Sequence, residues 1–235
     1  MLLELGGVRL LTDPVLRRTV VHLKRHAPVP EPPARLDAVL LSHLHHDHAH
    51  LPSLRLLDRR VRVIAPRGAG ALLRRAGFRD AQELAAGGRA EVGGVVVTAV
   101  QALHDDRRHP VGGVTATPIG FVVGCDPRVY FAGDTDLFDD MAELAPLDVA
   151  LLPVAGWGPK LGPGHLDPER AARAAALMRP RLAVPIHWGT LRPRYARVGA
   201  WFIDPPHAFA ARVAELAPDV EVRVISPGES VELPP

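Results

Sequence analysis

The sequence predicts a single layered α/β domain. Short runs of β-branched and aliphatic residues alternate with short segments of helical periodicity along the whole chain. The chain has 235 residues, enough for one sizeable core, and its 47% hydrophobic and 23% charged residues exclude wholesale disorder. No internal repeat or long flexible linker divides the sequence. Because strands and helices that alternate in one core imply stacked layers, we expect residues 1–235 to form one domain.

The expected elements follow the hydrophobic pattern. Runs rich in valine, isoleucine and leucine predict strands at 8–12, 38–42, 61–65, 95–101, 119–123, 129–132, 149–154, 182–186 and 221–225. Helical periodicity predicts helices at 52–60, 67–76, 137–145, 168–178 and 206–216. The helix at 168 has the clearest start, because Asp167 is a good N-cap, Pro168 suits the first helical position and Glu169 lies in the first turn.

Composition excludes several classes of protein. Cys125 is the only cysteine, which rules out an intramolecular disulfide and a thiolate zinc cluster and fits a reducing compartment. No uninterrupted apolar stretch approaches the roughly 18 residues of a membrane-spanning helix, and the amino terminus does not resemble a signal peptide, so we expect a cytoplasmic protein. The 28 basic residues are interleaved with 26 acidic ones, so no nucleic-acid partner is expected.

Five of the 12 histidines lie within residues 43–50, directly after a predicted strand. In an extended segment, residues two apart point the same way, so His43 and His45 can converge on one metal ion. A turn into the next helix redirects Asp47 and His48 towards a second ion. Ligands just past the end of a core strand sit in a loop on a rigid scaffold, where active sites are usually built. Two histidines of this run alternate out of the pattern and are assigned structural or solvated roles: His46 and His50.

The motif SHLHHDH at 42–48 resembles that of the metallo-β-lactamase-fold hydrolases, and three later pieces follow in the family's order. These are His104 after VVVTAVQAL, Asp134 in VYFAGDT and His187 in PIHWGT. The resemblance spans most of the chain and implies a four-layer αββα sandwich, with two mixed sheets and helices on the outer faces. It also implies seven ligands for two ions: His43, His45 and His104 for one, Asp47, His48 and His187 for the other, and Asp134 bridging both.

Three further motifs resemble a narrower group, the N-acyl-phosphatidylethanolamine phospholipase D enzymes and their bacterial L-ascorbate phosphate lactonase relatives. They are LTDPVL at 11–16, GHLDPERA at 164–171 and HWGT at 187–190. This resemblance implies that His165 lies near the reacting ester, for substrate contact or proton transfer, and we assign Trp188 to substrate binding. It implies that Asp13 supports a ligating histidine. Relatives carry one more strand before MLLELGG, so we expect the first strand of the family to be missing.

Imidazoles outnumber carboxylates five to two among the seven ligands, which suits zinc, with manganese or iron also compatible. We expect a hydrolase in which a metal-bridging hydroxide attacks a phosphodiester or another anionic phosphorylated small molecule. Asp47 would orient the nucleophile and His165 would serve the leaving group.

Several alternatives stay open. The same site would suit a lactonase or a thioesterase, and a non-catalytic metal-stabilised module and a di-iron redox protein are further readings. A phospholipid-like substrate would require contact with a membrane, for which three aromatic residues near the site loops are candidates: Trp157, Trp201 and Phe202. Cys125 is expected to be inert.

Overall fold

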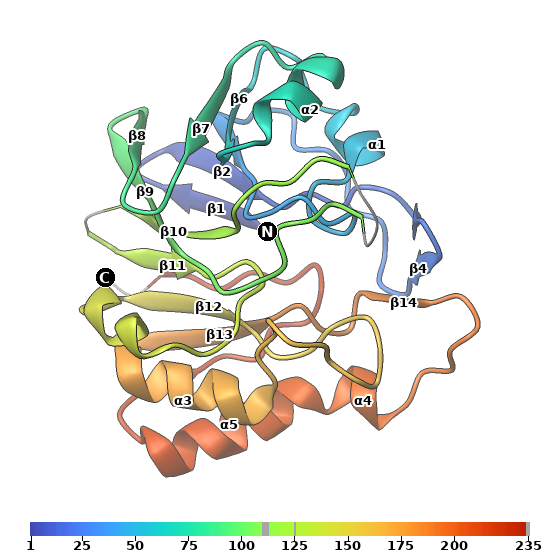
Figure 1. The fold of residues 1–235 in the computed structure, drawn as a ribbon. Helices are drawn as coiled ribbons and strands as arrows, with labels where there is room; N and C mark the ends of the chain where they lie inside the picture. The colour runs from blue at the N-terminus through green and yellow to red at the C-terminus, as the bar shows by residue number, and fades with distance from the viewer. Residues whose placement is uncertain (110–112, 125, 234–235) are drawn as a thin grey trace.

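The computed structural model describes residues 1–109, 113–124 and 126–233, so Cys125 lies outside the described residues. Two mixed β-sheets pack face to face, and helices cover the outer surface of each (Figure 1). The expected four-layer αββα sandwich is therefore confirmed. Within the described ranges, no helix combines the length and apolar character needed to cross a membrane.

The first sheet has the strand order β1-β2-β5-β6-β7. β1 pairs antiparallel with β2, and the other pairs are parallel. Side chains of β5 alternate between two cores: Ala38 and Leu40 point between the sheets, whereas Val39 packs with the helices outside. The elements of this half are β1 (Leu2–Leu5), β2 (Val8–Thr12), β5 (Ala38–Leu40), α1 (Leu51–Leu54), β6 (Arg62–Pro66), α2 (Gly70–Arg75) and β7 (Ala81–Leu84).

The second sheet has the order β15-β13-β12-β11-β10-β9-β8, with β11, β12, β13 and β15 parallel. In β12, Val149 and Leu151 face the core between the sheets, and Ala150 and Leu152 face the outer helices. The elements are β8 (Arg89–Val92), β9 (Val95–Gln101), β10 (Ile119–Val123), β11 (Val129–Phe131), η1 (Asp139–Leu144), β12 (Val149–Pro153), α3 (Pro168–Met178), β13 (Leu182–Ile186), α5 (Pro205–Leu216) and β15 (Glu221–Val222).

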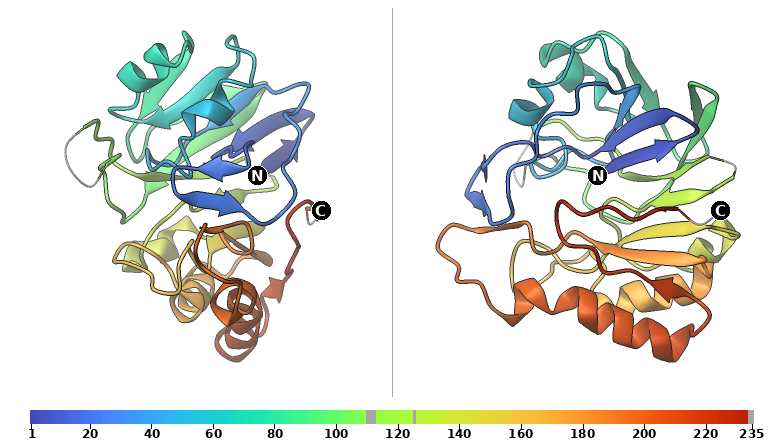
Figure 2. Two further views of the ribbon diagram at one scale, coloured as in Figure 1. Left: turned by 90° about the vertical axis from the view of Figure 1, so that its right-hand side faces the viewer. Right: turned by 180° about the vertical axis from the view of Figure 1, so that it is seen from behind.

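A small third sheet, ordered β14-β4-β3, lies at one end of the molecule, on the right in Figure 1 and facing the viewer in the left panel of Figure 2. The sequence pattern did not predict it, because its strands are two or three residues long and rich in basic side chains. Its strands are β3 (Thr19–Val20), β4 (Leu23–Arg25) and β14 (Leu191–Pro193), and the short helix α4 (Ala200–Ile203) follows β14.

Of the helices expected from the sequence, one is confirmed with the same bounds and two others differ from the expectation. The helix at 168–178 is confirmed, and the Asp167 side chain accepts a hydrogen bond from the Arg170 N–H at 2.8 Å, as an N-cap should. The α-helix expected at 137–145 is wrong. The segment forms a 3₁₀-helix, because Pro146 stops it after six residues and leaves room only for tight turns. The helix expected at 52–60 is also shorter, since the Asp58 side chain accepts from the Arg60 N–H and forms a turn.

Candidate metal centre

The seven expected ligands come from four separate segments that end at one edge of the sandwich. The carboxyl ends of parallel strands in one sheet meet at the same edge, which brings the residues after β11 and β13 together. The segment after β9 ends at this edge too, because β9 and β11 are both antiparallel to β10. The loop after β5 approaches from the other sheet. The sequence analysis expected this convergence from the family resemblance and from the strands that precede these residues.

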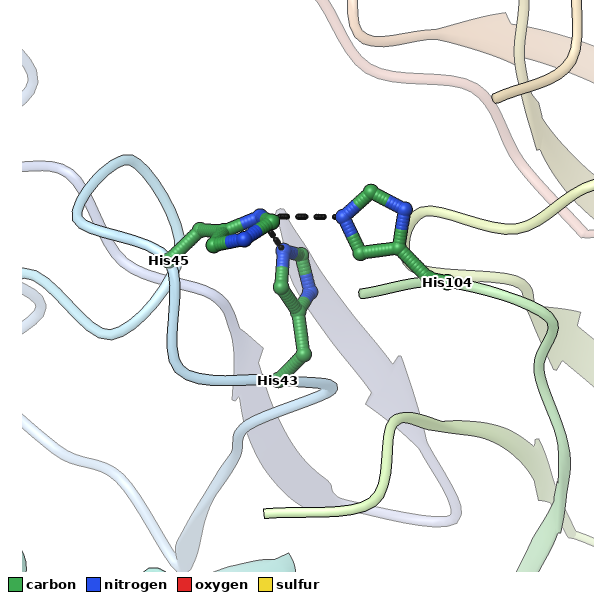
Figure 3. Close-up of side chains that lie close together, drawn as sticks. All are labelled: His43, His45 and His104. Atoms are coloured by element: carbon green, nitrogen blue, oxygen red, sulfur yellow. Dashed lines mark hydrogen bonds between the residues drawn. The ribbon is translucent and has the colours of Figure 1, made fainter. Parts of the chain in front are cut away.

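Three imidazoles form what we call the three-histidine cluster (Figure 3). His43 Nε2 lies 3.1 Å from His45 Nδ1, and His104 Nε2 lies 2.9 Å from the same nitrogen. His43 and His45 leave the loop after β5, and His104 reaches them from the segment after β9 (Figure 3). His43 is fully buried.

A second group, the aspartate–histidine cluster, consists of Asp47, His48 and His187. His48 Nε2 lies 3.1 Å from His187 Nε2. Asp47 Oδ2 lies 3.8 Å from His48 Nε2 and 3.7 Å from His187 Nε2. The two histidine rings are stacked almost parallel, with an interplanar angle of 8°.

Asp134 lies where the two clusters meet. Its Oδ2 is 3.2 Å from His48 Nε2 and its Oδ1 is 3.5 Å from His187 Nε2. One of its oxygens also lies within 4.8 Å of a ring nitrogen of His104, in the three-histidine cluster, and of a ring nitrogen of His165. Asp134 Oδ1 is buried and has no hydrogen-bond partner among the described residues. A buried carboxylate oxygen without a partner is costly unless a cation completes it.

Asp13 orients one histidine of each cluster. His48 Nδ1–H donates to Asp13 Oδ2 at 2.8 Å. Ser42 Oγ–H donates to the same oxygen at 2.5 Å and lies 2.9 Å from His43 Nδ1, from which it accepts. The expectation that Asp13 supports a ligating histidine is therefore matched by this contact. The role of Ser42 was missed, although the residue opens the SHLHHDH motif.

Backbone carbonyls orient two of the three remaining histidines. His104 Nδ1–H donates to the Gly164 carbonyl at 2.6 Å, and His187 Nδ1–H donates to the Ala155 carbonyl at 3.0 Å. Because carbonyl and carboxylate oxygens only accept, the Nδ1 atoms of these rings must carry the protons. The Nε2 atom of His187 then faces that of His48 at 3.1 Å, and the Nε2 atom of His104 faces His45 Nδ1 at 2.9 Å. Two nitrogen lone pairs at such a separation repel unless a proton or a metal ion lies between them. The donor set fits metal binding.

The backbone is strained at two of these positions. Asp13 and His187 adopt left-handed conformations, with φ of 39° and 63°, directly after β2 and β13. Such conformations cost of order 1–3 kcal/mol in non-glycine residues and gather at functional sites. Gly133 serves the site differently, since a Cβ there would lie 2.4 Å from the Ser42 Cβ. Only glycine lets the chain before Asp134 pass so close to the histidine loop.

The two clusters differ electrostatically. Burial lowers the pKa of His43 well below its usual value and lowers that of His104 to about 4, so these imidazoles are neutral and ready to ligate. Burial also disfavours charge on His48 and His187, but the carboxylates of Asp134 and Asp47 outweigh it and raise both pKa values. The same imidazoles hold the pKa of Asp134 well below its usual range despite burial.

Arg108 stabilises the loop that carries four of the ligands, a role that sequence reasoning missed. Its Nη1 donates to the carbonyls of Leu44 and Ala49, at 2.6 and 3.2 Å, and its Nη2 lies 3.3 Å from His46 Nδ1. His46 Nε2 lies 3.3 Å from His109 Nδ1, so His46 faces away from both clusters. His50 Nδ1 lies 2.6 Å from Ser53 Oγ.

The two substrate residues suggested by the sequence lie in different surroundings. His165 Nε2 is 3.6 Å from Asp134 Oδ2, and its ring contacts the His104 ring edge-on. Its Nδ1 lies 3.2 Å from the carbonyls of Gly162 and Pro163, so Nε2 is the nitrogen that faces the clusters. Trp188 Nε1 donates to the Pro185 carbonyl, and its ring packs against the core under the outer helices. Substrate binding by Trp188 stays a prediction.

Comparison with known proteins agrees with this geometry. A family model described as a beta-lactamase superfamily domain matches residues 8–188. A UPF0173 metal-dependent hydrolase of Methanopyrus kandleri is 35% identical over 243 residues, covering 97% of this chain and 94% of that protein. The chain belongs to the UPF0173 metal-dependent hydrolase family. The protein is thus a metal-dependent hydrolase of the metallo-β-lactamase fold.

Solved structures support the same fold. Igni18, a metallo hydrolase from the archaeon Ignicoccus hospitalis, superposes with a TM-score of 0.71 at 27% identity, over 98% of this chain and 92% of that one. An isothiocyanate hydrolase from Delia radicum gut bacteria gives a TM-score of 0.74 at 17% identity, over 99% and 96%. At that identity the second likeness shows the fold alone.

Proposed function

We propose that this UPF0173 protein is a dinuclear metal-dependent hydrolase that cleaves a phosphodiester or another anionic phosphorylated small molecule. The observation that supports this proposal most directly is the position of the Asp134 carboxylate. It lies close to both histidines of the aspartate–histidine cluster and also close to His104 of the three-histidine cluster. Zinc suits the imidazole-rich donor set, and manganese or iron are alternatives for the carboxylate-rich half. Two divalent ions against two ligating carboxylates leave surplus positive charge, which favours an anionic substrate.

Bound there, divalent cations would supply Lewis acidity and a water molecule acidic enough to act as hydroxide near neutral pH. The chain supplies the geometry. Asp134 spans both clusters, and Asp47 faces the same space with a carboxylate that can orient the attacking water. Asp13 and Ser42 fix which nitrogen of His43 and His48 faces inward, so the donor set is prepared before an ion arrives.

His165 is our candidate general acid. Its Nε2 faces the centre 3.6 Å from Asp134 Oδ2, and its side chain is 24% exposed, so it can meet a substrate that enters from solvent. A leaving group that departs as an alkoxide needs a proton, and an imidazole is suited to give one at neutral pH. The motif resemblance to the N-acyl-phosphatidylethanolamine phospholipase D and lactonase group supports this role. A phospholipid-like substrate and membrane contact stay predictions.

The decisive experiment compares metal content and hydrolysis in wild type, Asp134→Ala and Asp134→Asn. Purified proteins are assayed by elemental analysis and with bis(p-nitrophenyl) phosphate, a lactone and a thioester. We expect the wild type to hold two ions and prefer the diester, and both variants to lose metal and on the order of a thousandfold in rate. Full activity in a folded Asp134→Ala variant refutes the bridging role, and preference for the lactone or thioester changes the substrate class.

Replacing His165 tests proton transfer separately. We expect His165→Gln to keep both ions and to lose about ten- to a hundredfold in rate on a diester with an alkoxide leaving group. The loss should be much smaller for bis(p-nitrophenyl) phosphate, because p-nitrophenolate leaves without a proton. An equal loss on both substrates would mean that His165 shapes the site and does not transfer a proton.

A further inference from the structure

Charge is distributed very unevenly over this molecule. The segments 14–30, 155–166 and 188–203 contain eight of the 28 lysines and arginines, including both lysines, and no aspartate or glutamate. The other 20 cations are outnumbered by all 26 acidic residues. Six of the eight are exposed: Arg17, Arg18, Lys24, Lys160, Arg194 and Arg197. We call the face that these segments form the basic surface.

The three segments meet in space, although they are far apart in the chain. β4 pairs with β14, and the His26 N–H donates to the Thr190 carbonyl at 2.8 Å. The third segment joins through Trp157, whose ring lies 5.1 Å edge-on from the ring of His22. Together they form the end of the molecule that carries the small sheet (Figure 2).

Each segment of the basic surface either directly follows a residue of the candidate metal centre or contains groups that orient its histidines. Segment 14–30 follows Asp13, which orients His48. Segment 155–166 includes the carbonyls of Ala155 and Gly164, which accept from His187 and His104. Segment 188–203 follows His187 directly. All three segments of the basic surface are therefore joined directly to residues that form or orient the candidate metal centre.

The cations of this surface lack the partners that arginines have elsewhere. Nine other arginines form ion pairs with acids, whereas none of these eight does so within the described ranges. Arg25 and Arg192 bond only to backbone carbonyls, and Arg192 Nε is buried without a partner among the described residues. Arg192 stands directly opposite Lys24 in the β4–β14 pair, an arrangement of like charges that destabilises a sheet.

A hollow of about 690 Å³ beside His104 has a different character. Three aspartates line it, Asp105, Asp106 and Asp136, but Asp105 pairs with Arg107, and Asp136 pairs with Arg170, which also lines the hollow. The charges there are largely compensated, whereas those of the basic surface have no acidic partner within the described ranges. Unpaired charge of one sign raises the association rates of ligands with the opposite charge.

We propose that the basic surface collects the substrate and binds a second anionic group on it, several bonds away from the ester that is cleaved. The inference rests on the proposed hydrolase function and specifies its substrate class: a small molecule with at least two separated negative charges. Lys24 and Arg192 lie opposite each other and repel. An anionic group bound between them would relieve this repulsion, so we expect the strongest binding at this position.

The kinetic test uses two phosphodiesters with the same scissile bond. p-Nitrophenyl 4-carboxybutyl phosphate carries a terminal carboxylate, and p-nitrophenyl pentyl phosphate does not. In the double variant Lys24→Glu, Arg194→Glu, we expect the ratio of their kcat/KM values to shift about tenfold against the carboxylated diester. The control is Arg74→Glu, Arg75→Glu, two exposed arginines of α2, which should leave the ratio as in wild type. An unchanged ratio in the first variant overturns the proposal.

A binding test does not depend on hydrolysis. Pyrene-1,3,6,8-tetrasulfonate is a polyanion that ligates metals weakly, and its fluorescence anisotropy reports binding to the metal-loaded protein. We expect the Lys24→Glu, Arg194→Glu variant to bind it about tenfold more weakly than wild type and the α2 control. Equal binding by all three proteins overturns the basic surface as an anion site. If neither diester is hydrolysed but binding depends on Lys24 and Arg194, the surface stands and the proposed reaction falls.

Discussion

The three-histidine cluster and the aspartate–histidine cluster lie side by side, but the protonation states of their histidines are controlled by different interactions. In the first, burial, helped by neighbouring histidines, lowers the pKa values of His43 and His104 and keeps both rings neutral. In the second, Asp47 and Asp134 favour protonated forms of His48 and His187, so protons occupy the place that a metal ion would take. The comparison teaches that one centre can combine a site preformed by desolvation with one in which proton and metal compete.

The partners that orient the two clusters differ as well. A backbone carbonyl orients one histidine in each, but the second histidine of the aspartate–histidine cluster bonds directly to Asp13. In the three-histidine cluster, Asp13 acts on His43 only through the Ser42 hydroxyl. A change at Asp13 should therefore affect the clusters unequally.

Removal of one ligand from each cluster should give the largest effect. We expect His104→Ala to lose the ion of the three-histidine cluster and His187→Ala to lose the other, each with roughly a thousandfold loss of hydrolysis. Elemental analysis should show one ion in each variant against two in wild type. If either variant loses both ions, the clusters do not bind independently and the comparison breaks.

A smaller effect is expected from the residues that orient the ligands. Asp13 accepts from the Ser42 N–H, the Ser42 hydroxyl and His48, so an asparagine would place its NH₂ group against a donor. Asp13→Asn should weaken metal binding about ten- to a hundredfold, mainly in the aspartate–histidine cluster. Ser42→Ala is the matched change for the other cluster, and we expect less than about tenfold there. Chelator competition measures both, and the reverse order would contradict the asymmetry.

The smallest effect is a difference in pH dependence. Because the pKa values of His48 and His187 are raised, these rings keep their protons to higher pH, and metal binding must displace them. Apparent affinity at the aspartate–histidine cluster should therefore rise with pH across the neutral range. The three-histidine cluster should hold its ion into acid, because the pKa of His104 is lowered to about 4. Metal content measured after dialysis at a series of pH values should show the two ions leaving separately.

The sequence predicted most of the central strands, because these depend on local hydrophobic patterns. Local spacing indicated the candidate ligands of residues 43–48, and the family resemblance added His104, Asp134 and His187. The structure brings all seven side chains together. Strand 182–186 and helix 168–178 have the expected bounds, and the alternation of His43 and His45 survives in the loop. The short strands β3, β4 and β14 could not be predicted, since segments of two or three residues carry no measurable periodicity. β14 pairs with β4 across more than 160 residues of chain, whereas β3 and β4 pair across a short turn.

The sequence by itself determined the order of ligands, the alternation that builds the cores and the likeness to a hydrolase family. Only the tertiary structure decided which atoms orient those ligands, because the carbonyls of Ala155 and Gly164 leave no mark in a residue pattern. It also decided the electrostatics. The three acid-free segments can be found along the chain, but only folding brings them together beside the candidate metal centre. Electric potential sums over distance in space, and position along the chain does not enter it.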